Sequence, residues 1–542
     1  MIEKAFLENL FPNHRAILDA CRLPPPVHQR RYLVGGEIKT WKGPTRKVMS
    51  PVFTRDDAGR LTPVEIGSCP VTGVEEAEAA LAFAVTAYNS GGGVWPTMTV
   101  AERIACMQQF SRQMLAKRAE VVNLLMWETG KSLADSEKEF DRTLDYIKAT
   151  MDALKQMDNA NSSFVVVEGV IGQIRRTPLG IVLCMGPYNY PLNETFATLI
   201  PALIMGNTVI LKPPKFGVLL FHPLMEAFQK SFPAGVINFT YGKGEVVIPR
   251  LLESGLVNVL TLIGSSKVAG HLKKLPPKAN RLRAILGLDA KNAAIVLPDA
   301  DIDLAVKECL LGSLSFNGQR CTALKILLVH KKIVDTFLAR FDEELRKLKV
   351  GMPWEKGVQI TPLPEPGKPK YLTDCIEDAK EKGARVVNEG GGIFVESLFY
   401  PAVVYPVHEG MKLYREEQFG PVVPVMPFED IQTALDYVIS SEHGQQVSIF
   451  GSDPETIGKL VDPLVNQVCR VNINCQCQRG PDVFPFTGRK DSAEGTLSVT
   501  DALRSFSIRS MIAAKKNDTN EKIIQDIVEH HSSKFIHTGY LF

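Results

Sequence analysis

The chain has 542 residues, of which 45% are hydrophobic and 23% charged, a profile that indicates a folded protein of two or three domains. A net charge of +2 gives no electrostatic reason to expect nucleic acid or a membrane as a partner. Ten sparse cysteines favour reduced thiols over a disulfide framework, and Cys475 and Cys477 lack a second ligand pair, so no metal site is predicted.

The N-terminus gives no sign of a targeting segment. Residues 1–15 contain Glu3 and Glu8 and no long apolar core, which argues against a signal peptide. The longest apolar stretch, residues 196–211, is interrupted by Pro201 and is too short and broken to span a bilayer. We therefore expect a cytoplasmic protein.

The first third of the chain is predicted to be a surface leader followed by helices. Residues 1 to about 35 contain Pro24, Pro25 and Pro26 and should wrap the surface. Residues 99–154 carry apolar residues at three- and four-residue spacing, which is typical of amphipathic helices.

From Gly180 onward, short apolar runs alternate with helical patterns. The strands predicted first are residues 181–185, 209–211, 236–239 and 259–263, with a helix over 192–205. This rhythm predicts a doubly wound parallel sheet, and a second α/β series follows from residue 293 to about 474.

The predicted fold is therefore α/β in three parts with an extension. The predicted ranges are a dinucleotide-binding domain (1–160 and 179–288), a catalytic domain (289–480), a small β oligomerisation element (161–178 and 481–514) and a C-terminal extension (515–542). Strand-like segments at 165–176 and 505–513 fit neither α/β series, so we expect them to pair with each other and with another subunit. A homodimer or homotetramer is the predicted assembly. The extension is expected to be partly disordered or packed on a neighbour.

Cys321 is the candidate nucleophile. It follows Arg320, and a positive neighbour favours the thiolate form that attacks carbonyl carbons. Taken alone, a single cysteine is more often part of the packed interior.

Asn189 is the candidate oxyanion donor. It follows the predicted strand 181–185, where ligands bind in parallel sheets, and its amide can donate to a developing oxyanion. An Asx turn between Pro187 and Pro191 is the alternative interpretation.

Together these segments resemble the aldehyde dehydrogenase superfamily over roughly residues 65 to 515. The matching motifs, in family order, are WETGK at 127–131, PYNYP at 187–191, LKPP at 211–214, GQRC at 318–321, EEQFGP at 416–421 and FPF at 484–486. The resemblance implies that Cys321 is the nucleophile and that Asn189 and the Cys321 N–H form the oxyanion hole. It also implies that Glu417 holds the nicotinamide ribose and Lys212 the adenine ribose.

The branch that this chain resembles most is the non-phosphorylating, NADP-dependent glyceraldehyde-3-phosphate dehydrogenases. That branch holds the substrate phosphate with arginines and a tyrosine, and the matching positions here are Arg142, Tyr190, Arg320 and Arg479. Guanidinium groups suit a phosphate dianion because they form paired, charge-assisted hydrogen bonds. D-glyceraldehyde 3-phosphate is the expected substrate, and another phosphorylated or anionic semialdehyde is the alternative.

NADP is the expected cofactor. NAD-preferring relatives commonly carry a glutamate at the position of Lys215, and a lysine there would attract a 2′-phosphate, although Lys215 could instead point to solvent. The full set of expected cofactor-binding residues is Pro187, Lys212, Lys215, Gly242, Gly264, Ser265, Glu417 and Phe419.

One family feature is missing. Relatives usually carry a glutamate in an ELGGK run, where it activates the water that hydrolyses the thioester, and this chain reads ILGLDAKN at 285–292. One alignment puts Ile285 at the glutamate position and another puts Gly287 there. Asp289 is the tentative base, and Glu417 is another if it can swing. Release of the acyl group to coenzyme A, slow deacylation and a non-catalytic family member therefore stay open.

Overall fold

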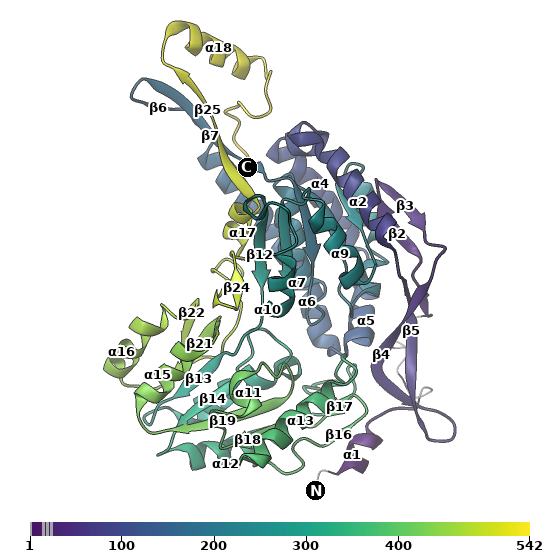
Figure 1. The fold of residues 1–542 in the computed structure, drawn as a ribbon, viewed down its shortest axis with the longest axis vertical. Helices are drawn as coiled ribbons and strands as arrows, with labels where there is room; N and C mark the ends of the chain where they lie inside the picture. The colour runs from purple at the N-terminus through teal and green to yellow at the C-terminus, as the bar shows by residue number, and fades with distance from the viewer. Residues whose placement is uncertain (1–2, 14–16, 18–20, 22–24) are drawn as a thin grey trace.

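The computed structural model describes residues 3–13, 17, 21 and 25–542 (Figure 1). Two α/β halves lie one above the other, and a narrow sheet protrudes from the upper half. The upper half is built on a six-stranded sheet and the lower half on a seven-stranded sheet. The predicted α/β class is confirmed.

The six-stranded sheet has the order β10-β9-β8-β11-β12-β24. All its strands run parallel except β24, which pairs antiparallel with β12. Its strands are β8 (Ile181–Met185), β9 (Thr208–Lys212), β10 (Ile237–Phe239), β11 (Val259–Ile263), β12 (Arg283–Gly287) and β24 (Ala493–Glu494). The four strands predicted from the sequence are all present, because a parallel sheet covered on both faces needs continuous apolar runs.

Helices cover both faces of this sheet. One face packs against α2 (Val74–Tyr88), α9 (Gly244–Glu253) and α10 (Ser266–Leu272). The other packs against α4 (Val100–Leu115), α5 (Arg118–Thr129), α6 (Leu133–Ala160), α7 (Asn193–Ile204) and α8 (Met225–Ser231). The predicted helical stretch at 99–154 is thus three helices, and α5 ends at Gly130, whose φ of 69° is a left-handed cap. Shorter turns are η3 (Asn89–Gly91), α3 (Val94–Thr97), η4 (Leu219–Phe221) and η5 (Ala279–Arg281).

The seven-stranded sheet has the order β15-β18-β19-β14-β13-β21-β22. Its strands are β13 (Ala293–Val296), β14 (Ile326–His330), β15 (Arg385–Val386), β18 (Ala402–Tyr405), β19 (Val422–Phe428), β21 (Gln446–Phe450) and β22 (Arg470–Ile473). One face is covered by α11 (Ile302–Leu314) and α12 (Val334–Leu345), and the other by α13 (Lys368–Glu381), α15 (Ile431–Ser440) and α16 (Pro454–Leu464). Minor elements are η6 (Ser315–Gly318), β16 (Phe394–Val395), β17 (Leu398–Phe399), α14 (Lys412–Arg415), β20 (His443–Gly444) and β23 (Arg489–Lys490).

The protruding sheet joins β6 (Val165–Val167), β7 (Val170–Pro178) and β25 (Ser507–Lys515). The predicted pairing of the two strand-like segments is confirmed, because β25 runs antiparallel to β7 along nine residue pairs. The side chains of β6 are exposed. Pairing with a second subunit stays a prediction.

The segment 481–514 does not lie wholly in the protruding sheet. Its β24 forms the edge of the six-stranded sheet, and its α17 (Val499–Ser505) packs against α6 and α7. Only β25 joins β7. The predicted oligomerisation element is therefore interleaved with the dinucleotide-binding domain.

The two ends of the chain lie on the surface of this frame. The N-terminal region forms α1 (Lys4–Asn9), β1 (Val27–His28), β2 (Arg31–Val34), β3 (Glu37–Thr40), β4 (Thr45–Arg55) and β5 (Leu61–Pro70). Of the three prolines of the predicted leader, Pro24 lies outside the described residues. The extension forms α18 (Asp518–Glu529), and its end returns to its own chain, where Asn159 exchanges two 2.7 Å hydrogen bonds with the backbone of Leu541. Among the described residues, no helix is long and apolar enough to cross a membrane.

Candidate active site

Six of the eight predicted cofactor residues lie at one edge of the six-stranded sheet, and the other two, Glu417 and Phe419, precede β19 of the seven-stranded sheet. The loops that leave its strands carry Pro187 after β8, Lys212 and Lys215 at and after β9, Gly242 after β10, and Gly264 and Ser265 after β11. Because the strands are parallel, their carboxyl ends meet at the edge where ligands bind in such folds. The structure thus brings together residues that are 78 positions apart in the sequence.

Three cations lie at the end of β9. Arg46, on β4, donates through Nη2 to the carbonyl of Lys215 at 3.1 Å. Burial and the charge of Arg46 lower the pKa of Lys212. Lys215 is exposed, with Nζ 5.2 Å from the centre of the Phe216 ring. Within the described part of the chain, no ion pair with a carboxylate is found for these three cations, so the donor set suits a 2′-phosphate.

Two loop residues are fixed by local packing. A Cβ on Gly242 would lie 2.3 Å from Val247 Cγ1 and 2.6 Å from the Thr72 carbonyl oxygen, so only glycine fits this turn. Ser265 is the N-cap of α10, and its hydroxyl accepts from the Val268 N–H at 3.4 Å. The close packing at Gly242 and the N-cap at Ser265 fix the backbone of these two loops at the carboxyl edge of the sheet.

Cys321 lies on an irregular loop between α11 and β14. The loop turns through three consecutive positive φ angles at Phe316, Asn317 and Gly318 (48°, 56° and 69°). This backbone is costly for the two side-chain residues and persists only when its surroundings hold it. Thr361 holds the Asn317 side chain by two hydrogen bonds. The Thr361 N–H donates to Asn317 Oδ1 at 2.9 Å, and Asn317 Nδ2 donates to the Thr361 hydroxyl oxygen at 3.2 Å.

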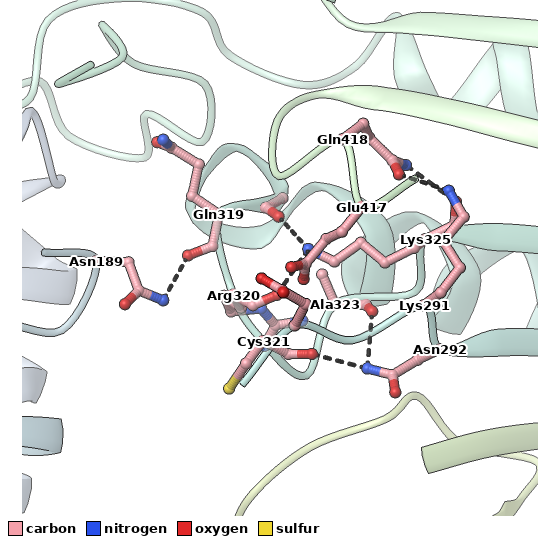
Figure 2. A network of polar contacts seen from close by, with 12 residues as sticks. Asn189, Lys291, Asn292, Gln319, Arg320, Cys321, Ala323, Lys325, Glu417 and Gln418 are labelled. Carbon is pink, nitrogen blue, oxygen red and sulfur yellow. Dashed lines mark hydrogen bonds and ion pairs between the residues drawn. The ribbon is translucent and has the colours of Figure 1, made fainter. Parts of the chain in front are cut away.

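A buried lysine, Lys325, stabilises the Cys321 loop by hydrogen bonds to its backbone. Lys325 donates through Nζ to the carbonyls of Gly318 at 3.1 Å and Arg320 at 2.8 Å. The same ammonium lies 3.3 Å from Glu417 Oε1 (Figure 2). Burial raises the pKa of Glu417, and Lys325 opposes that shift. Lys325 therefore ties the loop of Cys321 to the loop of Glu417.

A second buried lysine holds the Glu417 loop. Lys291 donates to the Glu416 carbonyl at 2.7 Å and to Gln418 Oε1 at 2.8 Å, and burial lowers its pKa to about 7. Next to it, Asn292 donates through Nδ2 to the carbonyl of Cys321 at 2.8 Å. Figure 2 shows these contacts as one network. These hydrogen bonds order the backbone of Cys321 in the absence of a substrate.

The Cys321 thiol is not the activated thiolate that the sequence suggested. Burial raises its pKa to about 11, with Glu194 adding most among the charged groups. The Arg320 guanidinium, expected to favour the thiolate, donates instead to the Gly312 carbonyl at 3.1 Å and to Gln476 Oε1 at 3.2 Å. The expectation that Arg320 favours the thiolate form of Cys321 is therefore wrong, because burial has the largest effect on the pKa of this thiol.

Asn189 faces the Cys321 loop, as predicted. Its Nδ2 donates to the Gln319 carbonyl at 2.9 Å, and the amide has a second N–H available (Figure 2). Its backbone carbonyl accepts from Lys131 Nζ at 2.8 Å. Lys131 is completely buried and paired with Glu139, whose Oε1 accepts from the N–H groups of two residues that follow Tyr190. The buried Lys131–Glu139 pair thus fixes the backbone of the segment that carries Asn189.

The predicted substrate residues line one pocket of about 460 Å³ together with Cys321. They are Arg142, Tyr190, Arg320 and Arg479, which come from α6, the loop after β8, the Cys321 loop and the loop after β22. Residues as far apart as 142 and 479 meet here, so the grouping predicted from the sequence is present in space.

Two of these arginines are already paired with carboxylates. Arg142 makes a bidentate contact with Asp482, at 3.0 and 2.6 Å. Arg479 pairs with Glu194 and lies 3.4 Å from Asp482. Burial opposes the charged form of Arg479, but the two carboxylates raise its pKa above the usual range. Arg320 has no carboxylate partner in the described residues, and its Nε is buried without a hydrogen-bond partner there.

Comparison with known proteins identifies the family. A model of the aldehyde dehydrogenase family matches residues 56–512. The chain belongs to this family. It is 33% identical over 465 residues to the NADP-dependent glyceraldehyde-3-phosphate dehydrogenase of Streptococcus equinus, covering 83% of this chain and 92% of the relative. It is 30% identical over 388 residues to the D-glyceraldehyde dehydrogenase (NADP(+)) of Thermoplasma acidophilum, covering 69% and 76%.

A solved structure of the family supports the fold. The NADP-dependent glyceraldehyde-3-phosphate dehydrogenase of Bacillus halodurans C-125, complexed with NADP, aligns with a TM-score of 0.81 at 28% identity. The alignment covers 90% of this chain and 99% of that one.

This aldehyde dehydrogenase has no acid at the strand end where the sequence left the alignment open. Ile285 lies in the middle of β12 and is 1% exposed, and Gly287 is the last residue of that strand. Asp289 Oδ2 accepts from the Ser266 N–H at 2.8 Å and from its hydroxyl at 2.7 Å. The tentative base is therefore engaged at the start of α10 and is not among the residues that line the Cys321 pocket.

Sequence reasoning missed several residues of this site. Lys131, Lys325 and Asp482 stood inside or beside quoted motifs, but a motif does not state which partner a charge will find. Glu194 carried a possible signal, because it lies five residues after Asn189 in the first turn of a buried helix. Among the described residues, no group of acidic, histidine and cysteine side chains could hold a metal ion.

Proposed function

We propose that this aldehyde dehydrogenase oxidises D-glyceraldehyde 3-phosphate to 3-phosphoglycerate with NADP, through a thioester on Cys321 and without inorganic phosphate. The observation that carries this proposal is the shared pocket of Cys321, Tyr190 and three arginines. A nucleophile beside guanidinium groups suits an aldehyde whose far end bears a phosphate. The relatives whose names mention this substrate agree with the proposal.

The proposed cycle begins when the Cys321 thiol loses its proton to solvent and the resulting thiolate attacks the aldehyde carbon. The carbonyl oxygen becomes an alkoxide, which the Asn189 amide and the Cys321 N–H stabilise. NADP, when bound, supplies the acceptor of the hydride that leaves the tetrahedral carbon. A thioester results, and water then attacks its carbonyl carbon and expels the Cys321 sulfur. Each protein group in this cycle is held by contacts described above, so little reorganisation is needed.

The cation cluster at the end of β9 supports NADP as the cofactor. Lys212, Lys215 and Arg46 offer positive charge where a ribose 2′-phosphate would bind, and a carboxylate is absent from the position of Lys215. A charge-assisted contact to the phosphate contributes about 1.5–3 kcal/mol. Glu417 and Phe419, on the facing loop, are proposed to contact the nicotinamide half. Pro187, Gly242, Gly264 and Ser265 are proposed to contact the remainder of the dinucleotide.

Phosphate recognition is proposed to centre on Arg320. Arg142 and Arg479 are neutralised by Asp482 and Glu194, so they offer ordered N–H groups with little net charge. Arg320 lines the pocket and, among the described residues, has no carboxylate partner and a buried Nε without a hydrogen-bond partner. Tyr190 adds a hydroxyl on the same wall.

The test is NADPH formation from D-glyceraldehyde 3-phosphate in buffer free of inorganic phosphate. Turnover at a rate of at least 1 per second would support the proposal, since enzymes of this kind turn over at about 1–1000 per second. Turnover only after phosphate is added would contradict it, because a phosphorolytic enzyme needs that acceptor. The Cys321→Ser variant is the matched control and should form no NADPH.

A second candidate is favoured by Gly287. Because that strand end carries no acid, release of the acyl group to coenzyme A is the second candidate reaction. Another phosphorylated or anionic semialdehyde is the alternative substrate. Steady-state turnover that depends on added coenzyme A would favour the acylating reaction. No NADPH with any aldehyde would favour a non-catalytic member of the family.

The protein is also proposed to act as a homodimer or homotetramer. The exposed apolar strand β6 and the long β7–β25 pairing support a second copy as the partner.

A further inference from the structure

Hydrolysis of a thioester needs a group that takes a proton from water, and either Ile285 or Gly287, both on β12, stands where relatives carry that group. The two carboxylates expected as substitutes are held elsewhere. Asp289 accepts two hydrogen bonds from Ser266, and Glu417 pairs with Lys325 on the cofactor side of the loop. The pocket of Cys321 nevertheless contains carboxylates of its own.

Glu194 is placed differently from those two residues. It lies in the first turn of α7, five residues after Asn189, and lines the pocket into which Cys321 opens. Only 6% of its surface is exposed, and its carboxylate pairs with Arg479. A buried carboxylate that lines the same pocket as the nucleophile is available to a water molecule that enters this pocket.

We propose that Glu194 is the general base that activates the deacylating water, in place of the acid that β12 lacks. This inference rests on the proposed thioester chemistry. It assigns a catalytic role to Glu194 in the pocket, and leaves Asp289 the structural role of binding Ser266 at the start of α10.

The electrostatics of the pocket agree with this placement. After burial, the charge of Glu194 is the largest contribution to the raised pKa of Cys321, ahead of Arg479 and Glu417. Coulombic influence falls with distance, so the Glu194 carboxylate acts on the sulfur more strongly than Glu417 does. Arg479 orients the carboxylate through their ion pair, and the Phe486 ring lies 4.7 Å from the guanidinium carbon.

The proposed step balances as follows. Glu194 takes one proton from water while the water oxygen forms a bond to the thioester carbonyl carbon. The carbonyl electron pair moves to oxygen, where Asn189 and the Cys321 N–H stabilise it. The oxyanion then collapses, the carbon–sulfur bond breaks, and Cys321 leaves as a thiolate. The proton on Glu194 passes to that thiolate, which restores the Glu194 carboxylate and the Cys321 thiol.

Glu194→Gln keeps the shape of the side chain and removes the base. We expect a rapid burst of about one NADPH per site, followed by steady-state turnover reduced at least 100-fold, because general bases contribute about 10²–10⁴-fold. Hydroxylamine should restore turnover, since a strong nucleophile needs no base. Asp135→Asn is the matched control. Asp135 lines the same pocket, but its carboxylate accepts from the Ser132 hydroxyl at 2.8 Å, and turnover should change less than threefold.

A second variant tests the idea by gain of function. A Cβ on Gly287 would meet Ile263 and Leu497 side chains at 3.5 Å or more, so a side chain fits at this position. Glu194→Gln with Gly287→Glu should recover at least tenfold of the lost steady-state rate.

The outcomes separate this inference from the proposed function. If the unmodified enzyme forms no NADPH with any aldehyde, the proposed function fails. If it turns over and Glu194→Gln is within threefold of it, only the role of Glu194 is refuted. Loss of the burst in a folded Glu194→Gln protein would also refute it, because Glu194 would then act before the thioester forms.

Discussion

The ammonium of Lys131 lies 2.8 Å from the backbone oxygen of Asn189, and both groups are buried. Lys131 also pairs with Glu139 and lies 3.8 Å from the centre of the Tyr190 ring. One buried cation therefore positions the proposed oxyanion donor and the adjacent tyrosine of the substrate pocket.

Lys131→Met should destabilise the protein by about 3–5 kcal/mol, because it leaves the Glu139 carboxylate buried without its counter-charge. Urea unfolding followed by circular dichroism measures the loss. Adding Glu139→Gln should recover part of it, since glutamine keeps an oxygen for the Leu192 and Asn193 N–H groups. A single-variant loss below about 1 kcal/mol would show that the pair is not a positioning element.

Iodoacetamide should label Cys321 faster as the pH rises, by about tenfold per unit from pH 7 to 10. Alkylation follows the thiolate fraction, and a thiol whose pKa is raised to about 11 is mostly protonated over this range. Glu194→Gln should speed labelling at a fixed pH, because losing the negative charge lowers the pKa. The rate is read from the Cys321 peptide by mass spectrometry, since the chain has nine other free cysteines. A rate that levels off below pH 9 would contradict the assigned shift.

Lys215→Glu should move the cofactor preference from NADP toward NAD. A carboxylate repels the 2′-phosphate and can accept from a free 2′-hydroxyl, so kcat/KM for NADP should fall at least tenfold, which corresponds to about 1.4 kcal/mol. Lys459→Glu, an exposed change on α16, is the charge-matched control. An unchanged NADP to NAD ratio in Lys215→Glu would place the 2′-phosphate elsewhere.

Arg320→Gln should discriminate between phosphorylated and unphosphorylated substrates. We expect kcat/KM for D-glyceraldehyde 3-phosphate to fall about 10- to 100-fold, as for loss of a charged hydrogen bond, with a smaller change for D-glyceraldehyde. Arg340→Gln, on the exposed face of α12, controls for net charge. Equal losses on both substrates would mean that Arg320 supports the Cys321 loop rather than the phosphate.

Much of the frame could be predicted from the sequence because parallel strands leave a direct trace. Each of the strands β8 to β11 is a short apolar run, and the polar or glycine residues after it must meet at one edge. The resemblance to the glyceraldehyde-3-phosphate dehydrogenase branch then grouped Cys321 with the four substrate residues. The pairing of β7 with β25 followed from two strands that fitted no α/β unit.

The charge arrangement of the site could not be predicted in the same way. Arg142 meets Asp482 across 340 positions, and Arg479 meets Glu194 on another element, so no local pattern encodes either pair. The pKa of Cys321 was misjudged for the same reason. Arg320 is adjacent in sequence, but its guanidinium is directed to Gly312 and Gln476, and burial dominates.

The position of β24 has a consequence for how this molecule can assemble. Its pairing with β12, and the 2.9 Å bond from Asn207 Nδ2 to the Phe506 carbonyl, join the last tenth of the chain to elements between residues 207 and 287. The six-stranded sheet of the upper half is therefore complete only when residues 493–494 are present. A gene cut between the halves would leave the first fragment without β24 and β25, whereas the second fragment would contain every strand of the seven-stranded sheet.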